Sequence, residues 1–410
     1  SVVKPVTVRS VNGPGATMIL GGGYLNELPV RGAFLSNGAV LCGFTISNGL
    51  TSSSDDLTFD QHGGGVYMGW NSMLSNCCVT ACYAFNRGGG VYAVATSTVA
   101  GCTVVHNEAG SGGGGLNCGP GTVHDCVIEH NRSVSVRNGG GVRATVTVLE
   151  RCIIRGNAGV GVRFDGAGWA RNCMIISNNG DYGGGVYNNN GAILESCFIA
   201  GNYASESGGG INVYISGAAR GCTVVGNRAR GGGGGISSPS AGWIENSIVY
   251  YNEAPVNPNC SIGKLPMRYS CTSPLLAGIG NFTNDPGLLA LGNPHIAASS
   301  PCIDAGTNVF SAAIDIDGEA RISGGRIDIG CDEYIAAGIT GALRVSIVPE
   351  YTNIGVGYAA RFWAGIEGKA SAAEWQFGDG ASVTDVAVPR HAWAAPGTYQ
   401  VRLTAWNNER

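Results

Sequence analysis

The chain of 410 residues is long enough for two or three ordinary domains, or for a repeat array followed by a module. Its 69 glycines and 15 prolines follow no three-residue period, which excludes a collagen helix. Charged residues make up 13% of the chain and the formal net charge is -4, so no basic stripe is available to bind nucleic acid. No apolar run reaches the roughly 20 residues that a membrane span needs.

A glycine triplet followed by an apolar residue recurs every 20 to 26 residues between positions 63 and 237. Each copy leads into a short strand-like run. Glycine at a constant place in the repeat predicts a corner where φ is positive or where a side chain would clash. The copies read GGGVY (63–67 and 88–92), GGGGLN (112–117), GGGVR (139–143), GVGVR (159–163), GGGVY (183–187), GGGIN (208–212) and GGGGGIS (231–237).

A second motif, an apolar run with cysteine in front and asparagine behind, recurs in register with the first. A repeat of about 24 residues with two or three short strands cannot bury its apolar face alone. Stacking the repeats makes a continuous core and pairs successive coils as parallel strands about 4.8 Å apart, which predicts an all-β parallel β-helix of roughly nine to ten coils. The copies are CTVVHN (102–107), CVIEHN (126–131), CIIRGN (152–157), CMIISN (173–178), CFIAGN (197–202), CTVVGN (222–227) and SIVYYN (247–252).

Equivalent residues of stacked coils are expected to form ladders. The cysteines should make an internal column of reduced thiols, because their parallel Cβ directions strain a disulfide. The asparagines should make a column at a corner, adopting the left-handed conformation and passing amide hydrogen bonds from coil to coil. The columns are Cys102, Cys126, Cys152, Cys173, Cys197 and Cys222, and Asn107, Asn131, Asn157, Asn178, Asn202 and Asn227.

The residue after each glycine triplet should point inward, and alternation then points its successor outward. The outward residues carry aromatic rings, guanidinium groups and amides, which stack on sugar rings and bind hydroxyls or carboxylates. The alternative is that tyrosine is simply common in sheets and that exposed arginine aids solubility. We call the outward series the sheet ladder: Tyr67, Tyr92, Asn117, Arg143, Arg163, Tyr187, Asn212 and Ser237.

The nearest approach to a catalytic site lies in the middle of this ladder. Arg143 and Arg163 are expected on neighbouring coils, with Asp165 further along the same face and Tyr187 one coil on. A lyase must neutralise a uronate and remove a proton, and glycoside hydrolysis needs two acids a few ångströms apart. One carboxylate is too few, unless the insertion at 49–62 folds over the first coils and supplies Asp55, Asp56, Asp60 and His62.

An irregular segment follows the coils at about 253–335. Within it, DIDG (315–318) has two spaced acids and a glycine, like the start of a calcium loop that lacks its other ligands. We interpret it as a turn, so the sequence predicts no metal site and no cofactor, with calcium the single ion left open. Two disulfides are also left open, Cys260 with Cys271 and Cys302 with Cys331, because either bridge would close a loop of useful length.

A separate module is predicted at 341–410, after a linker at 336–340. WQFGDG (375–380) predicts a strand that runs into a tight turn, and YQVRLTAW (399–406) alternates as a half-buried strand does. A complete sandwich would need one further strand after Asn408, so we expect an open edge that invites pairing with another chain. With His391, Trp393 and PGTYQVRLTAWNN (396–408), these residues resemble a PKD domain, an immunoglobulin-like β-sandwich of extracellular proteins.

Residues 1–335 resemble the bacterial right-handed parallel β-helix family, and within it surface proteins of the choice-of-anchor Q type. The resemblance rests on KPVTVRSVNGPGATMILGG, LCGFTISNG, the repeated motifs, SPCIDAGT (300–307) and DIDGEARISGGRIDIGCDEY (315–334). It implies a right-handed β-helix but no single activity, since the family mixes pectate-lyase-like enzymes with adhesins and other surface proteins. A capping segment and a first coil normally precede KPVTVRSVNGP, so we expect this chain to be part of a longer protein.

Both resemblances imply export and so predict a secreted or cell-surface protein. The leading hypothesis is a non-catalytic protein of adhesion, glycan binding or structure, which recognises a polysaccharide or cell-surface glycan and self-associates through the open sandwich edge. The alternative is a polysaccharide lyase or glycoside hydrolase that acts on an acidic polysaccharide along the sheet ladder. For that alternative, Arg143, Arg163, Asp165 and Tyr187 are the candidate catalytic residues.

Overall fold

The computed structural model describes residues 1–22, 29–53, 60–94, 96–135, 137–238, 242–263, 266–309 and 313–409. The chain divides into two compact units. The first unit comprises Ser1–Arg220, Val224–Ile244 and Tyr251–Pro266, and the second comprises Gly221–Thr223, Glu245–Tyr250 and Met267–Arg410.

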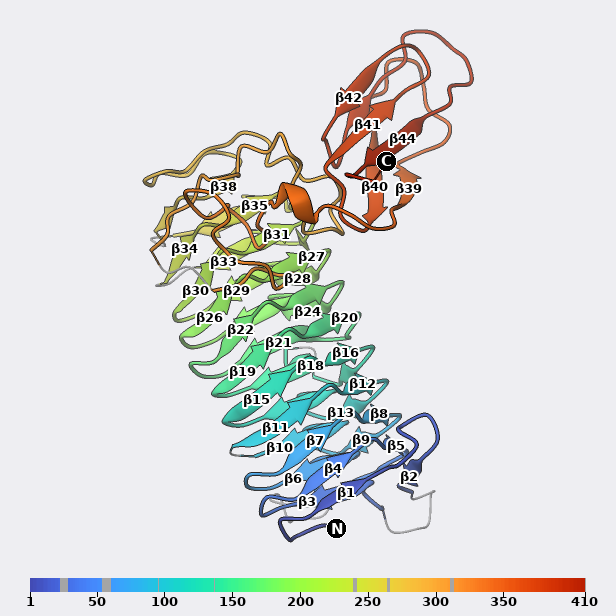
Figure 1. Cartoon of the computed structure of the whole chain (residues 1–410), viewed down its shortest axis with the longest axis vertical. Coiled ribbons are helices and arrows are strands. Elements are labelled where there is room, and N and C mark those ends of the chain that lie inside the picture. Colours follow the sequence, from blue (N-terminus) through green and yellow to red (C-terminus); the bar gives the residue numbers. More distant parts are fainter. Residues whose placement is uncertain are drawn as a thin grey trace. The chain divides into compact units, whose positions relative to one another are not determined.

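The first unit is the predicted parallel β-helix, whose stacked coils are visible in Figure 1. Sheet A holds the strands that follow the glycine triplets, with one further strand before and one after them, and ten of its strands lie in the described part of the chain. All of its neighbouring strands pair in parallel, as the repeat predicted. The strands are β3 (Ala33–Leu35), β6 (Val66–Met68), β10 (Val91–Ala93), β14 (Leu116–Cys118), β18 (Gly139–Ala144), β21 (Val160–Phe164), β25 (Val186–Asn188), β29 (Ile211–Val213), β33 (Ile236–Ser238) and β36 (Cys260–Ile262).

Sheet B lies between the two motifs of each repeat, where the sequence pattern was too short to show a strand. Strand β15, for example, buries only Val123 among polar neighbours, which is too little alternation to recognise. Apart from β37 (Met267–Arg268), its strands are β1 (Thr7–Arg9), β4 (Val40–Cys42), β7 (Met73–Ser75), β11 (Ser97–Ala100), β15 (Gly121–His124), β19 (Thr147–Glu150), β22 (Trp169–Arg171), β26 (Ala192–Glu195), β30 (Gly217–Arg220) and β34 (Trp243–Glu245).

Sheet C holds the strands that follow the cysteines, and short strands then lead to the next glycine triplet. Apart from β35 (Ile248–Tyr250) and β38 (Cys271–Thr272), the strands of sheet C are β2 (Met18–Leu20), β5 (Thr45–Ser47), β8 (Cys78–Thr80), β12 (Thr103–Val105), β16 (Val127–Glu129), β20 (Ile153–Arg155), β23 (Met174–Ile176), β27 (Phe198–Ala200) and β31 (Thr223–Val225). The short strands are β9 (Tyr83–Ala84), β13 (Glu108–Ala109), β17 (Arg132–Ser133), β24 (Asn179–Tyr182), β28 (Tyr203–Ser207) and β32 (Arg228–Ala229).

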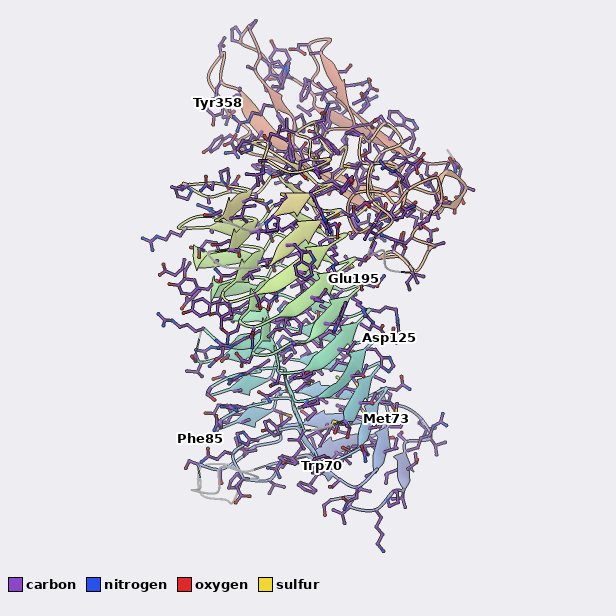
Figure 2. The ribbon with its side chains drawn as sticks, turned by 90° about the vertical axis from the view of Figure 1, so that its left-hand side faces the viewer. Trp70, Met73, Phe85, Asp125, Glu195 and Tyr358 are labelled. Carbon is purple, nitrogen blue, oxygen red and sulfur yellow. The ribbon has the colours of Figure 1, made fainter. Side chains whose placement is uncertain are left out.

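Side chains of one face repeat from coil to coil. Figure 2 shows Met73 and Glu195, from β7 and β26 of sheet B, on the same side of the coils as Asp125, which follows β15. On the inner face, the predicted apolar residues after the glycines are at most 1% exposed and form the core. They are Val66, Val91, Leu116, Val142, Val162, Val186, Ile211 and Ile236.

The glycine corners have the two properties that the sequence predicted. The first glycine of a triplet has a positive φ in most coils, as in Gly113 at +62°, although Gly139 does not. The second has no room for a side chain, because a Cβ on Gly114 would overlap the backbone of Arg132. Glycine is therefore required by backbone conformation at one position and by close approach of the next coil at the other.

The asparagine column is present, with one correction to its backbone. The Nδ2 of Asn107 donates to Oδ1 of Asn131 at 3.0 Å, and the same bond repeats along the column to Asn252. The left-handed residue is not the asparagine but the one before it, such as His106 or His130. The asparagines are buried instead, since their amides must point inward to satisfy one another and the carbonyls of the previous coil.

The cysteine column is also present, and none of the 15 cysteines forms a disulfide. Cys102 and Cys126 lie on neighbouring coils, where the backbone N–H of Cys102 is 3.4 Å from Sγ of Cys126. The two disulfides that the sequence left open do not form: Cys260 is not bridged to Cys271, and Cys302 is not bridged to Cys331. The Cys302 side chain faces Cys271 instead of Cys331, because the irregular segment places Cys331 against Thr223.

The second unit contains the irregular segment and the predicted sandwich. Its elements are β35 (Ile248–Tyr250), β37 (Met267–Arg268), β38 (Cys271–Thr272), the short 3-10 helix η1 (Ala336–Gly338), and the antiparallel strands β39 (Arg344–Pro349), β40 (Ala360–Glu367), β41 (Ala372–Gln376), β42 (Ser382–Thr384), β43 (Arg390–His391) and β44 (Arg402–Trp406). Two three-stranded sheets, β39-β40-β43 and β42-β41-β44, enclose the fully buried Trp375. The predicted GDG turn is present, with Asp379 accepting hydrogen bonds from Ala381 N and from His391 Nε2.

Candidate functional site

The sheet ladder exists as an unbroken register of strand pairs along sheet A. Tyr92 pairs with Tyr67 on one side and Asn117 on the other, and Arg143 pairs with Arg163. Each member therefore lies one coil from the next, as the alternation in the sequence predicted. The remaining pairs join Asn117 to Arg143, Arg163 to Tyr187, Tyr187 to Asn212, and Asn212 to Ser237.

The ladder is more recessed than alternation alone indicates. Tyr67 is only 5% exposed. Its ring stacks on Phe34 of the preceding coil with centroids 5.1 Å apart, and Tyr92 lies 5.4 Å away on the other side. The guanidinium carbon of Arg31 lies 5.4 Å from the Tyr67 ring centroid. In these first positions of the ladder, the aromatic faces are used by neighbouring side chains.

The insertion at 49–62 reaches the ladder through His62. The His62 ring stacks on Tyr92 with centroids 4.4 Å apart, and Asp60 lies within electrostatic reach of Arg31. His62 therefore contacts Tyr92 directly, and Asp60 interacts with Arg31, which contacts Tyr67. The other two acids that the sequence singled out in this insertion, at 55 and 56, lie outside the described residues.

Asp165 joins the two stacked arginines. Its Oδ2 accepts a hydrogen bond from Arg143 Nε and its Oδ1 one from Arg163 Nε, both at 2.7 Å. Burial alone would raise the pKa of Asp165, but the hydrogen bonds and charges of the two arginines outweigh it and hold the pKa below its usual range. Asp165 is therefore an ionised carboxylate at neutral pH, with both oxygens occupied.

The cationic cluster extends beyond this pair. Arg87 is close enough to Arg143 that the two charges repel, and burial together with this repulsion lowers the pKa of Arg87. Arg163 Nη1 donates to the carbonyl of Arg137 at 2.7 Å, and its guanidinium carbon lies 5.0 Å from the Tyr187 ring centroid. The cluster of Arg87, Arg143 and Arg163 thus carries more positive charge than Asp165 neutralises.

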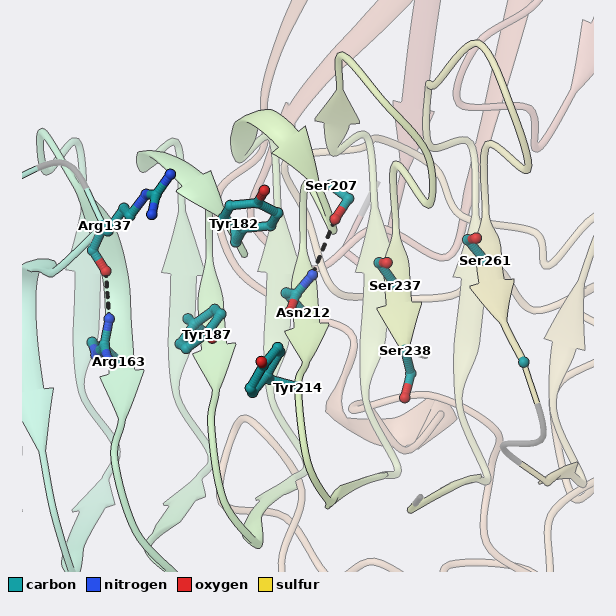
Figure 3. Close-up of a pocket in the computed structure, with 11 residues that line it drawn as sticks. Arg137, Arg163, Tyr182, Tyr187, Ser207, Asn212, Tyr214, Ser237, Ser238 and Ser261 are labelled. Carbon is teal, nitrogen blue, oxygen red and sulfur yellow. Dashed lines mark hydrogen bonds between the residues drawn. The ribbon is translucent and has the colours of Figure 1, made fainter. Parts of the chain in front are cut away.

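A groove of about 670 Å³ opens beside Arg163. Figure 3 shows the rings of Tyr187 and Tyr214 next to each other, with Arg163 beyond Tyr187 and with Ser237, Ser238 and Ser261 beyond Tyr214. The two ring centroids are 6.3 Å apart, and Asn212 Nδ2 donates to Ser207 Oγ at 3.2 Å. The groove is lined by Arg137, Arg163, Tyr182, Tyr187, Ser207, Asn212, Tyr214, Ser237, Ser238, Ser261 and Gly263.

Sequence reasoning missed the other seven residues of this lining, which are Arg137, Tyr182, Ser207, Tyr214, Ser238, Ser261 and Gly263. Tyr182 and Ser207 each stand directly before a glycine triplet, so their nearness to the ladder was a usable signal. Tyr214 lies outside the repeated positions, just after β29, and nothing in the sequence singled out Arg137. The ladder residues Arg163, Tyr187, Asn212 and Ser237 are brought together in the groove, whereas Tyr67, Tyr92, Asn117 and Arg143 are not among its lining.

Comparison with known proteins supports the second unit most directly. Residues 351–409 match the family model of the PKD domain, a module typical of extracellular proteins. Among solved structures, the chain is similar to the crystal structure of pectate lyase Pel9A, with 15% identity, a TM-score of 0.43, and coverage of 81% of this chain and 87% of that chain. No curated protein matches the sequence. In the described part of the chain, no helix has the length and apolar character to cross a bilayer. The finer resemblance to choice-of-anchor Q proteins stays a prediction.

Proposed function

We propose that this protein is a secreted or cell-surface glycan-binding protein without catalytic activity, whose binding site is the sheet A groove. The observation that carries the proposal is the composition of that groove: two tyrosine rings side by side, a guanidinium over one of them, and a row of hydroxyl and amide groups. The match to the PKD domain supports the extracellular location.

The groove chemistry favours an acidic polysaccharide. Tyr214 is 55% exposed and offers a ring face to the apolar side of a sugar. Arg163 presents a planar donor suited to a carboxylate or sulfate, and the neighbouring excess of positive charge attracts such groups. Asn212, Ser237 and Ser261 line the groove as partners for sugar hydroxyls.

The same residues give little support to the enzymatic alternative. No carboxylate stands among the described residues that line the groove, and Asp165 is ionised and bound to two arginines. An ionised, doubly paired carboxylate is a poor general acid. Burial raises the pKa of Tyr187, so its phenol is neutral and a poor base. Arg143 and Arg163 each donate a hydrogen bond to Asp165, so both stay charged and fixed in place. This favours a role in binding an anionic group over a role as a base.

The test is the affinity for acidic glycans of matched arginine variants. Isothermal titration with polygalacturonate, alginate and a sulfated glycosaminoglycan should show binding to the wild type, and Arg163→Ala should weaken it about tenfold, ~1.4 kcal/mol. Arg171→Ala is the control, because Arg171 belongs to sheet B and not to the sheet ladder. Its guanidinium carbon lies over an aromatic ring in the same way, 4.2 Å from the Trp169 ring centroid.

Equal losses in the two variants, or no binding by the wild type, would refute the groove as the site. The catalytic alternative is checked with the same polymers, by following the ultraviolet absorbance of unsaturated products and the release of reducing sugars. Turnover that Arg163→Ala abolishes would replace the binding proposal with the lyase.

The edge of the sandwich carries a second part of the proposal, self-association. Strand β44 lies at the end of the sheet order β42-β41-β44, so one of its sides is an edge. We expect the protein to associate through this edge at high concentration, measured by sedimentation velocity. Thr404→Pro would remove a backbone donor from β44 and should reduce association. An unchanged monomer over the whole concentration range contradicts this part alone.

A further inference from the structure

A compact cluster of one histidine and two carboxylates lies in the second unit, far from the groove in sequence. His295 Nε2 is 2.8 Å from Oδ2 of Asp317 and 3.8 Å from Oδ1 of Asp332. All three potential ligand atoms lie within 4.8 Å of one another, and within the described residues no other group of three or more such side chains does so. Asp317 comes from the DIDG segment, which the sequence interpreted as a turn.

The hydrogen bonds of His295 determine which of its nitrogens carries a proton. Asn293 donates its Nδ2 to the carbonyls of Ile366 and Gly368, so its Oδ1 must be the atom that faces His295. That oxygen accepts from the backbone N–H of His295 and from Nδ1 of its ring. Nδ1 therefore carries a hydrogen, and the lone pair of a neutral ring would lie on Nε2.

A lone pair on Nε2 would point at two carboxylates, which is repulsive. The contact is favourable only if Nε2 carries a second proton or if a cation lies between the three side chains. A metal-binding histidine usually has its other ring nitrogen held in this way by an oxygen acceptor, which here is Asn293.

The buried carboxylate of Asp332 is a second, independent indication that a cation binds among these three side chains. Its side chain is 5% exposed, yet its Oδ1 has no hydrogen-bond partner. A void of about 10 Å³, lined in part by His295, Asp332 and Lys369, lies beside it. That volume is about the size of one water molecule or ion.

We propose that His295, Asp317 and Asp332 form a binding site for a divalent cation of the zinc class. Imidazole nitrogen with carboxylate oxygens is a ligand set that zinc accepts, whereas calcium prefers oxygen ligands alone. Zinc holds such ligands at about 2.0–2.2 Å in a tetrahedron, so the ligand atoms lie about 3.4 Å apart. This spacing falls between the 2.8 and 3.8 Å of the cluster, so small side-chain movements suffice.

Lys369 would compete with the metal for the carboxylate of Asp317. Its Nζ lies 2.8 Å from Asp317 Oδ2 and 3.0 Å from Glu319 Oε2, so it can keep Glu319 when Asp317 turns to the metal. Lys369 belongs to the loop after β40 of the sandwich, and Asn293 bonds to the same loop. Metal binding would therefore stabilise the packing of the irregular segment on the PKD module.

The test is zinc titration of the whole chain after removal of metals with a chelator. Isothermal titration should show one zinc ion per chain, and Asp332→Asn should weaken binding at least about tenfold. Asp379→Asn is the matched control, because Asp379 and His391 form the same 2.8 Å carboxylate–imidazole pair with similar exposure but without a third ligand. This control should leave the zinc affinity unchanged.

Two further measurements keep the proposal open to refutation if Asp332→Asn folds poorly. Lys369→Met removes the competing cation and should tighten zinc binding several-fold. Cobalt(II) added in place of zinc should give the intense visible absorption of a tetrahedral site. Absence of zinc binding, binding of calcium but not zinc, or equal loss in Asp332→Asn and Asp379→Asn would each overturn the site.

Discussion

The first and last positions of the sheet ladder carry similar side chains and use them differently. At the first positions, the almost fully buried Tyr67 ring stacks on Phe34 of the preceding coil at 5.1 Å and packs against the tilted Tyr92 ring at 5.4 Å. At the last positions, Tyr187 has Arg163 on one side and Asn212 on the other, and the neighbouring Tyr214 is largely exposed. The first region is closed by its own aromatic side chains, and the second is an open groove.

The spacing of the coils explains this difference. Coils repeat at about 4.8 Å, close to the separation of stacked rings, so aromatic residues on consecutive coils cover each other. At Tyr187 the next coil supplies the Asn212 amide in register, and the Tyr214 ring centroid lies farther away, at 6.3 Å. Membership of the sheet ladder therefore predicts that a side chain lies on the outer face of sheet A. The size of the residue one coil away determines whether that side chain is covered by its neighbour or is accessible to a ligand.

The largest expected effect is on stability at the closed end. Tyr67→Ala should lower the free energy of unfolding by about 3 kcal/mol, because it removes a buried ring from a stack. Tyr214→Ala should cost less than about 0.5 kcal/mol, since that ring is mostly exposed. Denaturant unfolding followed by circular dichroism measures both, and similar losses would remove the contrast between the two regions.

The next effect is on binding at the open end. Tyr187→Ala should weaken the affinity for an acidic glycan by about 1 kcal/mol, roughly fivefold, because a sugar loses its stacking surface beside Arg163. Tyr92→Ala should leave the affinity within about twofold, because its ring is already covered by His62 and Tyr67. Affinity electrophoresis with the two variants checks this, and a loss in Tyr92→Ala alone would reverse the assignment.

A smaller effect is expected from the carboxylate between the two regions. Asp165→Asn leaves Arg143 and Arg163 without their counter-charge, so the affinity for an acidic glycan should rise about threefold, ~0.7 kcal/mol. The gain should shrink with added salt because the interaction is electrostatic. Titration at two ionic strengths measures it, and a loss of affinity would indicate that Asp165 itself contacts the ligand.

The smallest effect is the pH dependence of the same group. The folded-state pKa of Asp165 lies below the usual value of about 3.9, so its stabilising contribution is complete above that value. The contribution is lost as the pH falls through the folded-state pKa. Thermal unfolding of wild type and Asp165→Asn should therefore differ by a constant amount above about pH 5 and converge in more acidic solution. A difference that persists to the lowest pH would contradict the ion pairs.

Much of the first unit could be predicted from the repeat. The cysteine and asparagine columns, the inward valines and the order of the sheet ladder all follow from one period, because stacked coils place equivalent residues together. The PKD module was likewise recognisable from WQFGDG and the strand before Asn407. The strands of sheet B were missed, since three or four residues carry too little alternation to detect.

Other features were decided only by the three-dimensional arrangement. The left-handed corner falls on His106 instead of Asn107, because the asparagine amide is needed inside the column. Tyr214 becomes part of the groove although it stands outside the repeat.

By itself, the sequence determined which residues recur on each side of a coil, since a nearly constant repeat length places equivalent residues at the same position of successive coils. Only the tertiary structure decided where that surface is hollow and how Asp317 and Asp332 meet His295. Groove depth and this cluster depend on turns of irregular length, whose path is set by packing and hydrogen bonding instead of by any period that can be read from the chain.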